Sequence, residues 1–295
     1  MSQFDAADPR KRYRSGQPDQ SQDHPGDSAR MRPEPDHGEE TYRGCGRLTG
    51  RKAVITGGDS GIGRAVAIAY AREGADVLIS FLPEEAVEAK RTEAYVQEAG
   101  RTAVLVPGDI RDEEHCHQII ETAVGELGGL DILVNNAAYQ QAQPDGLAGI
   151  TTEQLDRVYR TNVYAMFWLC QAALPHLTAG ATIINTTSVE AYDPAPPLLD
   201  YASTKAAILN FTRGLSQQLA PQGIRVNAVA PGPIWTPLIP ATMPADHIGE
   251  FGTDTPLGRA GQPAELAPAY VFLASGESSY ITGERIGITG GRILA

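Results

Sequence analysis

Cysteine is scarce in this sequence: 295 residues contain only Cys45, Cys116 and Cys170. They are widely spaced, make no CxxC pair and form no metal-ligand cluster with histidine. A disulfide framework and a metal site are therefore not expected. Buried or unreactive thiols in a reduced, cytoplasmic setting fit this cysteine content best.

Basic residues are in the minority, and long apolar runs are missing. The chain has 24 Lys and Arg against 36 Asp and Glu, a formal net charge of −12. Phosphates would be repelled, so neither nucleic acid nor an anionic membrane is expected as a partner. No run of about 18 apolar residues occurs, which excludes a transmembrane helix. The N-terminal residues have no apolar stretch after their basic side chains, so no secretory signal is expected.

Residues 1–47 have few large apolar side chains but many charges and five prolines. Such a segment cannot bury enough surface to fold alone. We expect an N-terminal arm that is either disordered or laid over another surface. If it is laid over another surface, Phe4, Tyr13, Met31 and Tyr42 are its anchors. Its contribution would then be to assembly more than to chemistry.

From Leu48 onward, short apolar runs alternate with amphipathic stretches. The apolar runs are 53–56, 75–80, 103–106, 132–134, 182–186, 224–230 and 286–289. The helices are expected near 62–73, 84–99, 112–127, 153–177, 201–220 and 263–274. This alternation predicts βαβ units and a doubly wound parallel α/β sheet (a Rossmann fold) in one domain, residues 48–295. Ligands bind such sheets at the carboxyl ends of the strands.

A glycine-rich turn follows the first predicted strand. It reads GGDSGIG over 57–63 and leads directly into a predicted helix. Glycines let the chain turn tightly and let a pyrophosphate approach the amides that begin the helix. The strand–turn–helix context favours a dinucleotide site over an ordinary tight turn.

The second strand ends without the carboxylate that often holds a ribose 2′-hydroxyl. Ser80 and Phe81 occupy the position, and the first carboxylates are Glu84 and Glu85, past Pro83. No Lys or Arg stands there to attract a 2′-phosphate either, so NAD and NADP both remain open. We expect NADPH to be used at least as well as NADH.

Asp109 ends the third strand and has two possible roles. It could accept a hydrogen bond from an adenine amino group, or it could cap the following helix. Both readings stay open.

The fifth strand ends in Thr187-Ser188, and the sequence YASTK follows at 201–205. Tyr201 and Lys205, four residues apart, share one helix face. A cation beside a phenol lowers the pKa of the phenol, which suits Tyr201 for proton transfer. The pair alone is more often surface packing.

Together these stretches resemble the short-chain dehydrogenase/reductase family. The matching stretches are TGGDSGIG at 56–63, GDI at 108–110, NNAA at 135–138, TN at 161–162, Ser188, YASTK at 201–205 and PGPIWT at 231–236. They occur in the family's order, from about residue 48 to the end. The segment PDHGEE at 35–40 also resembles a bacterial subgroup with an N-terminal extension, some members of which are described as aldehyde reductases or general stress proteins.

The resemblance implies a role for each matching residue. Tyr201 would be the general acid/base, Lys205 would bind the nicotinamide ribose, Ser188 would orient the carbonyl, and Asn162 would hold a relay water. The implied cofactor contacts are Gly57, Ser60, Gly61, Ile62, Gly63, Asp109, Ile110, Asn136, Ala137, Pro231, Gly232, Ile234 and Thr236, with Tyr201 and Lys205. The chain departs from the family pattern at Ala138, where glycine is usual, and one methyl there could crowd the cofactor or narrow the substrate entrance.

The sequence thus predicts an NAD(P)-dependent oxidoreductase that acts on a small carbonyl or alcohol. The alternatives are a non-catalytic NAD(P)-binding regulatory or scaffold protein and an epimerase or dehydratase on the same scaffold. The resemblance implies a homotetramer. Apolar residues in the helix near 153–177, among them Val163, Met166, Phe167 and Leu169, suggest helix pairing between subunits.

Overall fold

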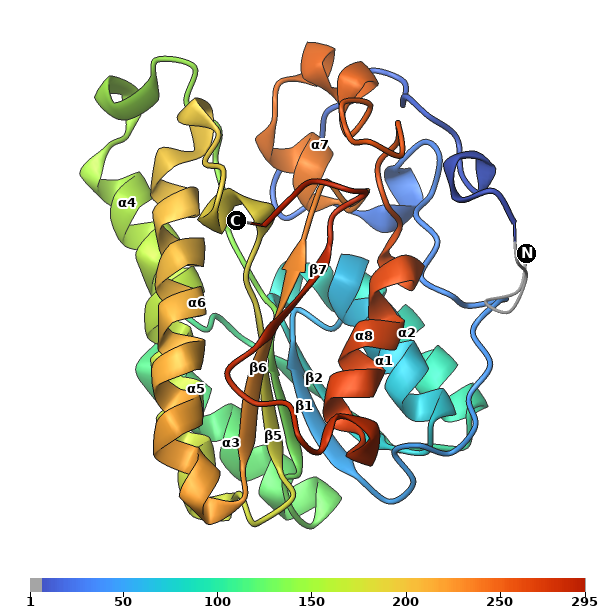
Figure 1. The fold of residues 1–295 in the computed structure, drawn as a ribbon, viewed down its shortest axis with the longest axis vertical. Helices are drawn as coiled ribbons and strands as arrows, with labels where there is room; N and C mark the ends of the chain where they lie inside the picture. Colours follow the sequence, from blue (N-terminus) through green and yellow to red (C-terminus); the bar gives the residue numbers. More distant parts are fainter. Residues whose placement is uncertain (1–6, 295) are drawn as a thin grey trace.

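The computed structural model describes residues 7–294, and its centre is one seven-stranded sheet (Figure 1). The strands are β1 (Lys52–Thr56), β2 (Asp76–Phe81), β3 (Ala103–Pro107), β4 (Ile132–Asn135), β5 (Thr182–Thr186), β6 (Arg225–Pro231) and β7 (Arg285–Ile288). All pairs are parallel, in the order β3-β2-β1-β4-β5-β6-β7. The order reverses between β1 and β4, as in a doubly wound sheet, so the predicted fold is confirmed.

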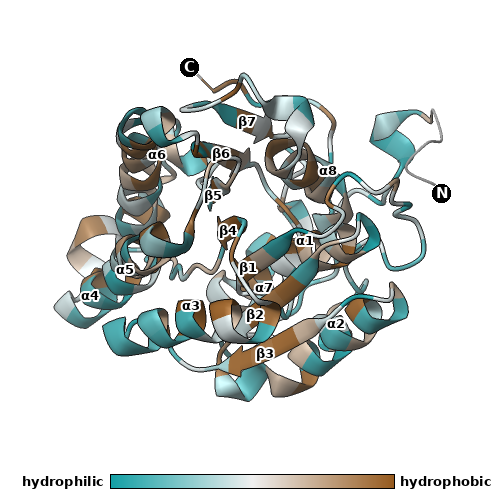
Figure 2. Ribbon diagram, turned by 90° about the horizontal axis from the view of Figure 1, so that it is seen from below, coloured by the Kyte–Doolittle hydropathy of each residue, from teal (hydrophilic) through white to brown (hydrophobic). Residues whose placement is uncertain are grey.

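Helices cover both faces of the sheet (Figure 2). One layer contains α1 (Gly61–Arg72), α2 (Ala86–Glu98) and α8 (Pro263–Ala274). The other contains α3 (Glu113–Leu127), α5 (Ala165–Ala173) and α6 (Leu199–Leu219), with α4 (Thr152–Tyr159) beside α6. Neighbouring strand residues such as Val54 and Ile55 are therefore both fully buried, on opposite faces. No helix within residues 7–294 combines the length and apolar character needed to cross a membrane.

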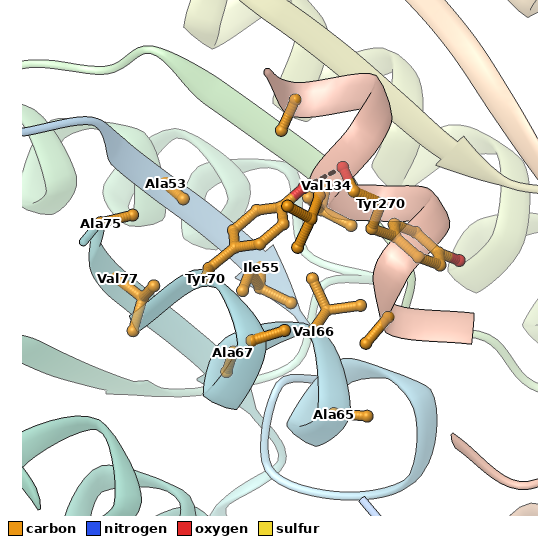
Figure 3. Close-up of a cluster of buried hydrophobic side chains, with 14 of the residues drawn as sticks. Ala53, Ile55, Ala65, Val66, Ala67, Tyr70, Ala75, Val77, Val134 and Tyr270 are labelled. Atoms are coloured by element: carbon orange, nitrogen blue, oxygen red, sulfur yellow. Dashed lines mark hydrogen bonds between the residues drawn. The ribbon is translucent and has the colours of Figure 1, made fainter. Parts of the chain in front are cut away.

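Helix α1 packs on α8 through buried side chains, among them Tyr70 and Tyr270 (Figure 3). Small residues of α1, such as Ala65 and Ala67, contribute to this buried cluster. The hydroxyl of Tyr70 donates to the carbonyl of Tyr270 (3.2 Å). The hydroxyl of Tyr270 in turn shares a hydrogen bond with that of Thr186 (2.7 Å). The core is thus connected to the last residue of β5, where the chemistry is expected.

The helical segment predicted over 153–177 is confirmed in its extent, because the chain is helical from Thr152 to His176, but it is not one regular α-helix. The structure has α4, a π-helical turn at Arg160–Tyr164, α5 and a 3-10 turn at Leu174–His176. The irregular turn contains Asn162, whose side chain is held by the loop after β4 and by α6. Hydrophobic periodicity does not detect such tertiary hydrogen bonds.

The apolar residues assigned to subunit contact are mostly core residues. Val163, Met166 and Leu169 are buried, and only Phe167 keeps 43% of its surface exposed. Phe167 packs on Phe211 of α6 with ring centroids 4.4 Å apart. The sequence therefore suggested more apolar surface for contact between subunits than the structure leaves exposed on these residues.

Residues 7–47 lie against the rest of the chain as an extended arm with two 3-10 turns, Pro9–Lys11 and Ser28–Arg30. Met31 is fully buried in a cluster with Trp235, Ile239 and Ile248. The indole of Trp235 donates to the carbonyl of Pro33 (2.8 Å). Of the four predicted anchors, Met31 and Tyr42 are buried, Tyr13 binds the Asp36 carboxylate (2.6 Å), and Phe4 lies outside the described residues.

The end of the arm is fixed by one buried carboxylate at the end of α1. Glu73 accepts hydrogen bonds from the hydroxyl of Tyr42 (2.7 Å) and the N–H groups of Cys45 (2.9 Å) and Arg47 (3.0 Å). The Arg47 guanidinium adds two more, at 2.6 and 3.0 Å. The pKa of Glu73 falls to about 2, since these bonds outweigh the opposing effect of burial.

Candidate active site

A cavity of about 640 Å³ opens at the carboxyl ends of the strands. The sequence-predicted residues in its wall are Gly57, Ser60, Gly61, Ile62, Asp109, Ile110, Asn136, Ala137, Ser188, Tyr201, Lys205, Pro231, Gly232, Ile234 and Thr236. Gly63 and Asn162 lie behind this wall. Residues spread over 180 positions of sequence therefore converge on one site.

The glycine turn forms the floor of the cavity at the start of α1. Ser60 makes no side-chain cap, so the first N–H groups of α1 are left for a ligand. Gly61 has a φ of +49°, and a Cβ there would lie 3.2 Å from the side chain of Thr236. A Cβ on Gly63 would lie 1.9 Å from the carbonyl oxygen of Gly57, so this glycine lets the turn pack on the helix. These features fit a dinucleotide pyrophosphate.

Tyr201, Lys205 and Ser188 are all buried and line the same cavity. The Lys205 ammonium is 5.3 Å from the centre of the Tyr201 ring and donates to the carbonyl of Thr186 (2.9 Å). The Ser188 hydroxyl is near enough to Tyr201 to act on the pKa of its phenol. A phenol, a hydroxyl and a cation thus meet where β5 ends against α6.

The pKa values of Tyr201 and Lys205 differ from those expected from the sequence. Burial raises the pKa of Tyr201 above its ordinary value, although the Ser188 hydroxyl acts in the opposite direction. Burial also lowers the pKa of Lys205 to about 7, so the lysine is only partly charged at neutral pH. The predicted lowering of the tyrosine pKa is therefore not found, because burial raises the pKa by more than the Ser188 hydroxyl lowers it.

Asn162 lies one layer behind the cavity wall. Its side chain accepts from the N–H of Tyr139 (2.8 Å) and donates to the carbonyl of Tyr139 (2.9 Å) and the hydroxyl of Thr204 (3.0 Å). It therefore joins the loop after β4 to α6 and leaves its side chain no free group. A role in proton relay would have to use its backbone.

Two other predicted contacts are also engaged in structural bonds. The amide of Asn136 donates to the carbonyls of Thr56 (3.0 Å) and Gly57 (3.3 Å), which ties β4 to the glycine turn. Asp109 accepts from Arg111 at 2.5 and 2.8 Å, and these bonds hold its pKa below the ordinary value against the effect of burial. The helix-cap alternative for Asp109 is wrong, because Asp112 caps α3.

The substrate side of the cavity is formed by loops after β4, β5 and β6. Of the side chains considered from the sequence, Tyr139, Gln140 and Glu190 line it. Trp235 does not, since it is fully buried in the cluster with Met31. The segment over residues 237–258, here called the lid, contains α7 (Leu238–Thr242) and a 3-10 turn at Ala245–Glu250. Ala138, which replaces the usual glycine, also lies in the wall.

A pair of carboxyl groups, Asp59 and Glu85, was missed by the sequence reasoning. Both line the cavity beside Ser80 and Phe81, although Glu85 is four residues beyond the end of β2. A 3-10 turn at Pro83–Glu85 brings it back, and its carboxylate accepts from the N–H of Leu82 (3.0 Å). Burial and the adjacent Asp59 raise the pKa of Glu85 to about 9, and burial raises that of Asp59 to about 6. Carboxyl groups therefore do reach this end of the cavity, and burial beside Asp59 favours the protonated form of Glu85.

Replacing Glu85 by Gln is expected to raise the melting temperature, and more so at higher pH. The folded protein holds a proton on Glu85 up to about pH 9, whereas the unfolded chain releases it near pH 4.5. The stabilisation that protonated Glu85 contributes to the wild-type protein is thus complete below pH 4.5, and it is lost as the pH rises toward 9. Glutamine keeps the acceptor for Leu82 and has no such dependence.

Thermal melting at several pH values between about 5 and 9 measures this effect. Glu84→Gln is the control, because Glu84 is the exposed neighbour. A difference between Glu85→Gln and wild type that stays constant with pH would contradict the assignment.

The arm also reaches the cavity, which the sequence did not indicate. His24 and Pro25 stand in its wall, with Arg111 and Arg157. The ring of His24 meets that of Tyr139 edge-on at 5.0 Å, and its Nδ1 lies 3.2 Å from the Arg157 guanidinium. No feature of residues 20–30 marks them as site residues, because only the folded arm brings them there.

Comparison with known proteins agrees with this geometry. A family model described as "Enoyl-(Acyl carrier protein) reductase" matches residues 57–292. The chain belongs to the short-chain dehydrogenase/reductase family, and its chemistry is nicotinamide-dependent oxidoreduction on a small molecule. The resemblance found in the sequence is confirmed.

Several relatives cover nearly the whole chain. "Uncharacterized oxidoreductase YghA" of Escherichia coli is 56% identical, over 97% of this chain and 98% of that protein. "General stress protein 39" of Bacillus subtilis is 50% identical, over 92% and 94%. "Glucose and ribitol dehydrogenase" of Daucus carota is 43% identical, over 94% and 97%. A short-chain dehydrogenase of Burkholderia cenocepacia, solved in complex with NADP, has a TM-score of 0.78 and 34% identity, over 83% of this chain and 98% of that one.

Proposed function

We propose that this protein reduces a small aldehyde or ketone, or oxidises the corresponding alcohol, with Tyr201 as the general acid/base. The observation that carries this proposal is the meeting of Tyr201, Ser188 and Lys205 in one cavity with the uncapped start of α1. A bound nicotinamide would supply or accept the hydride. In the reducing direction, the hydroxyl of Tyr201 gives its proton to the substrate oxygen, which Ser188 holds by hydrogen bonding.

Lys205 is proposed to supply positive charge beside Tyr201 as the phenolate forms. Its pKa near 7 lets it exchange a proton at neutral pH, and its bond to the Thr186 carbonyl fixes its position. Asn162 would have a positioning role, because its side chain holds the loop at Tyr139 against α6. The pyrophosphate would be held at Gly57, Ser60, Gly61 and Ile62, and the nicotinamide ribose near Pro231, Gly232, Ile234 and Thr236.

For the cofactor, we propose that NADPH is used at least as well as NADH. The Arg157 side chain supplies positive charge to the cavity, Arg111 is paired with Asp109, and the raised pKa of Glu85 disfavours a negative charge there. The Burkholderia neighbour was solved with NADP, which supports the same preference.

The polar wall at Gln140, Glu190 and Arg292 suits a hydroxylated substrate. One relative carries the name glucose and ribitol dehydrogenase, so sugars and polyols belong in the first test.

A screen of candidate substrates with both cofactors tests these proposals. Loss of NADPH and NADH absorbance is followed with short aldehydes, ketones and sugars, and the reverse reaction with ribitol and glucose. Substrate-dependent turnover, with kcat/KM for NADPH no lower than for NADH, is expected. Tight cofactor binding without turnover on any substrate would instead favour the non-catalytic alternative.

We also propose a cytoplasmic homotetramer. Cys45, Cys116 and Cys170 are all free thiols, as a reducing compartment would maintain them. Tyr164, Phe167 and Leu199 leave apolar surface exposed around α5 and α6, and Ile293 does so near the C-terminus. Light scattering at micromolar concentration tests the assembly, and a monomer mass would contradict it.

A further inference from the structure

The arm contributes His24 and Pro25 to the wall of the cavity, and Gly26 follows them directly. On one side it is fixed to the lid: the N–H of Gln22 donates to the carbonyl of Pro240 (2.9 Å). Gly26 has a φ of +90°, and a Cβ there would lie 2.7 Å from the carbonyl oxygen of Pro237. Only glycine lets the arm lie this close to the beginning of the lid.

On the other side, His24 is held by groups of the domain itself. Its ring packs edge-on against Tyr139, while the Arg157 guanidinium lies 3.9 Å from the centre of the same tyrosine ring. Arginine can only donate, so Nδ1 of His24 accepts from Arg157 and the ring proton resides on Nε2. Burial, with Arg157 and Arg111, lowers the pKa of His24 to about 4, so this ring is a neutral hydrogen-bond donor.

The position of His24 places it on the side of the cavity where the adenosine half of a dinucleotide would bind. In a doubly wound sheet, the pyrophosphate lies at the start of α1, and the adenosine lies on the side of β2 and β3. The charges that act on His24 come from Glu84 after β2, Arg111 after β3 and Arg157 on α4. The ring therefore stands over the adenosine side, and Gly26 stands nearer the pyrophosphate, beside Pro237.

We propose that the N-terminal arm is part of the cofactor site: residues 24–26 form the outer wall of the adenosine subsite, and the His24–Arg157 pair contacts the bound adenosine moiety. This rests on the proposed nicotinamide-dependent function. It reverses the expectation that the arm contributes to assembly more than to chemistry. The family model matches residues 57–292, so the arm lies outside the matched part of the chain.

Equilibrium binding without substrate tests the proposal. Dissociation constants and dissociation rates of NADPH and NADH are measured by fluorescence for wild type, His24→Ala and Gly26→Ala. His24→Ala removes the contact, whereas Gly26→Ala displaces the arm from Pro237 without changing the chemical identity of any cavity side chain. Each is expected to weaken both cofactors roughly 5- to 20-fold, mainly through faster dissociation.

Matched controls separate this effect from general damage. Gly100→Ala puts a methyl at φ +73° in open space, and Ser21→Ala alters an exposed arm residue. Both are expected to bind like wild type. Wild-type dissociation constants in both His24→Ala and Gly26→Ala would overturn the proposal. A wild-type protein that binds neither cofactor would instead contradict the proposed function.

The unaltered protein offers a second measurement. A cofactor held under the arm must also hold the arm down, because coupling between two binding events is reciprocal. Trypsin cleavage after the exposed Arg14 and Arg30, on either side of His24, is expected to slow severalfold in saturating NADPH. Equal cleavage rates with and without NADPH would overturn the proposal.

Discussion

Replacement of Tyr201 by Phe is expected to lower turnover about 10²- to 10⁴-fold, which is the usual contribution of a positioned acid or base. The substitution removes the hydroxyl that exchanges the proton but keeps the buried ring that packs beside Lys205. Stability and cofactor binding should therefore change little. Steady-state kinetics with any accepted substrate, together with a melting curve and an NADPH dissociation constant, measure the three quantities.

Tyr159→Phe is the matched control. Its hydroxyl also contacts α6, at Ser203 (2.9 Å), but it lies outside the cavity. Turnover within a few-fold of wild type is expected for this variant. If Tyr201→Phe were equally active, the assignment of Tyr201 as the acid/base would be wrong.

Replacement of Glu73 by Gln is expected to destabilise the protein strongly at neutral pH. Breaking a buried ion pair costs about 3–5 kcal/mol, and the partial exposure of Arg47 places the expected loss at about 2–3 kcal/mol. The glutamine cannot accept from all the donors that Glu73 accepts from, and its NH₂ group would face the Arg47 guanidinium. Denaturant unfolding at pH 7 measures the loss.

The effect should disappear in acid. The pKa of Glu73 is lowered to about 2, so its stabilisation is complete above pH 4.5 and is lost as the pH falls from there toward 2. The difference between wild type and Glu73→Gln should shrink over the same range.

Glu277→Gln is the control for this prediction, since Glu277 approaches the same Arg47 at 3.5 Å but is more than half exposed. It should cost less than about 1 kcal/mol. An equal loss for both variants would mean that the burial of Glu73 is unimportant.

Local pattern was sufficient to predict the sheet and most of the cavity wall. Buried strands bounded by turns, and a glycine turn between strand and helix, are encoded by residues near each other in the chain. The parallel topology then brings strand ends together at one edge, and the resemblance to the short-chain dehydrogenase/reductase family assigned Gly61, Ser188 and Tyr201 to one site there.

Long-range packing decided the rest. The pKa of Tyr201 depends on burial by elements far away in sequence, and desolvation reversed the direction that the Tyr–Lys spacing suggested. Glu85 reaches the cavity only through the turn after β2, where Asp59 meets it. The irregular turn at Asn162 reflects its bonds to Tyr139 and Thr204, which leave no trace in hydrophobic periodicity.

The sequence by itself determined that a charged, proline-rich arm precedes an α/β domain with a dinucleotide site. Only the tertiary structure decided where that arm lies. An arm with so few apolar residues has no periodic pattern of its own, and its position is selected by the surfaces it meets: the cluster around Trp235, the Glu73 carboxylate, and the Tyr139–Arg157 pair that receives His24. Those surfaces exist only after the domain has folded, because each combines residues from elements that are distant in the chain.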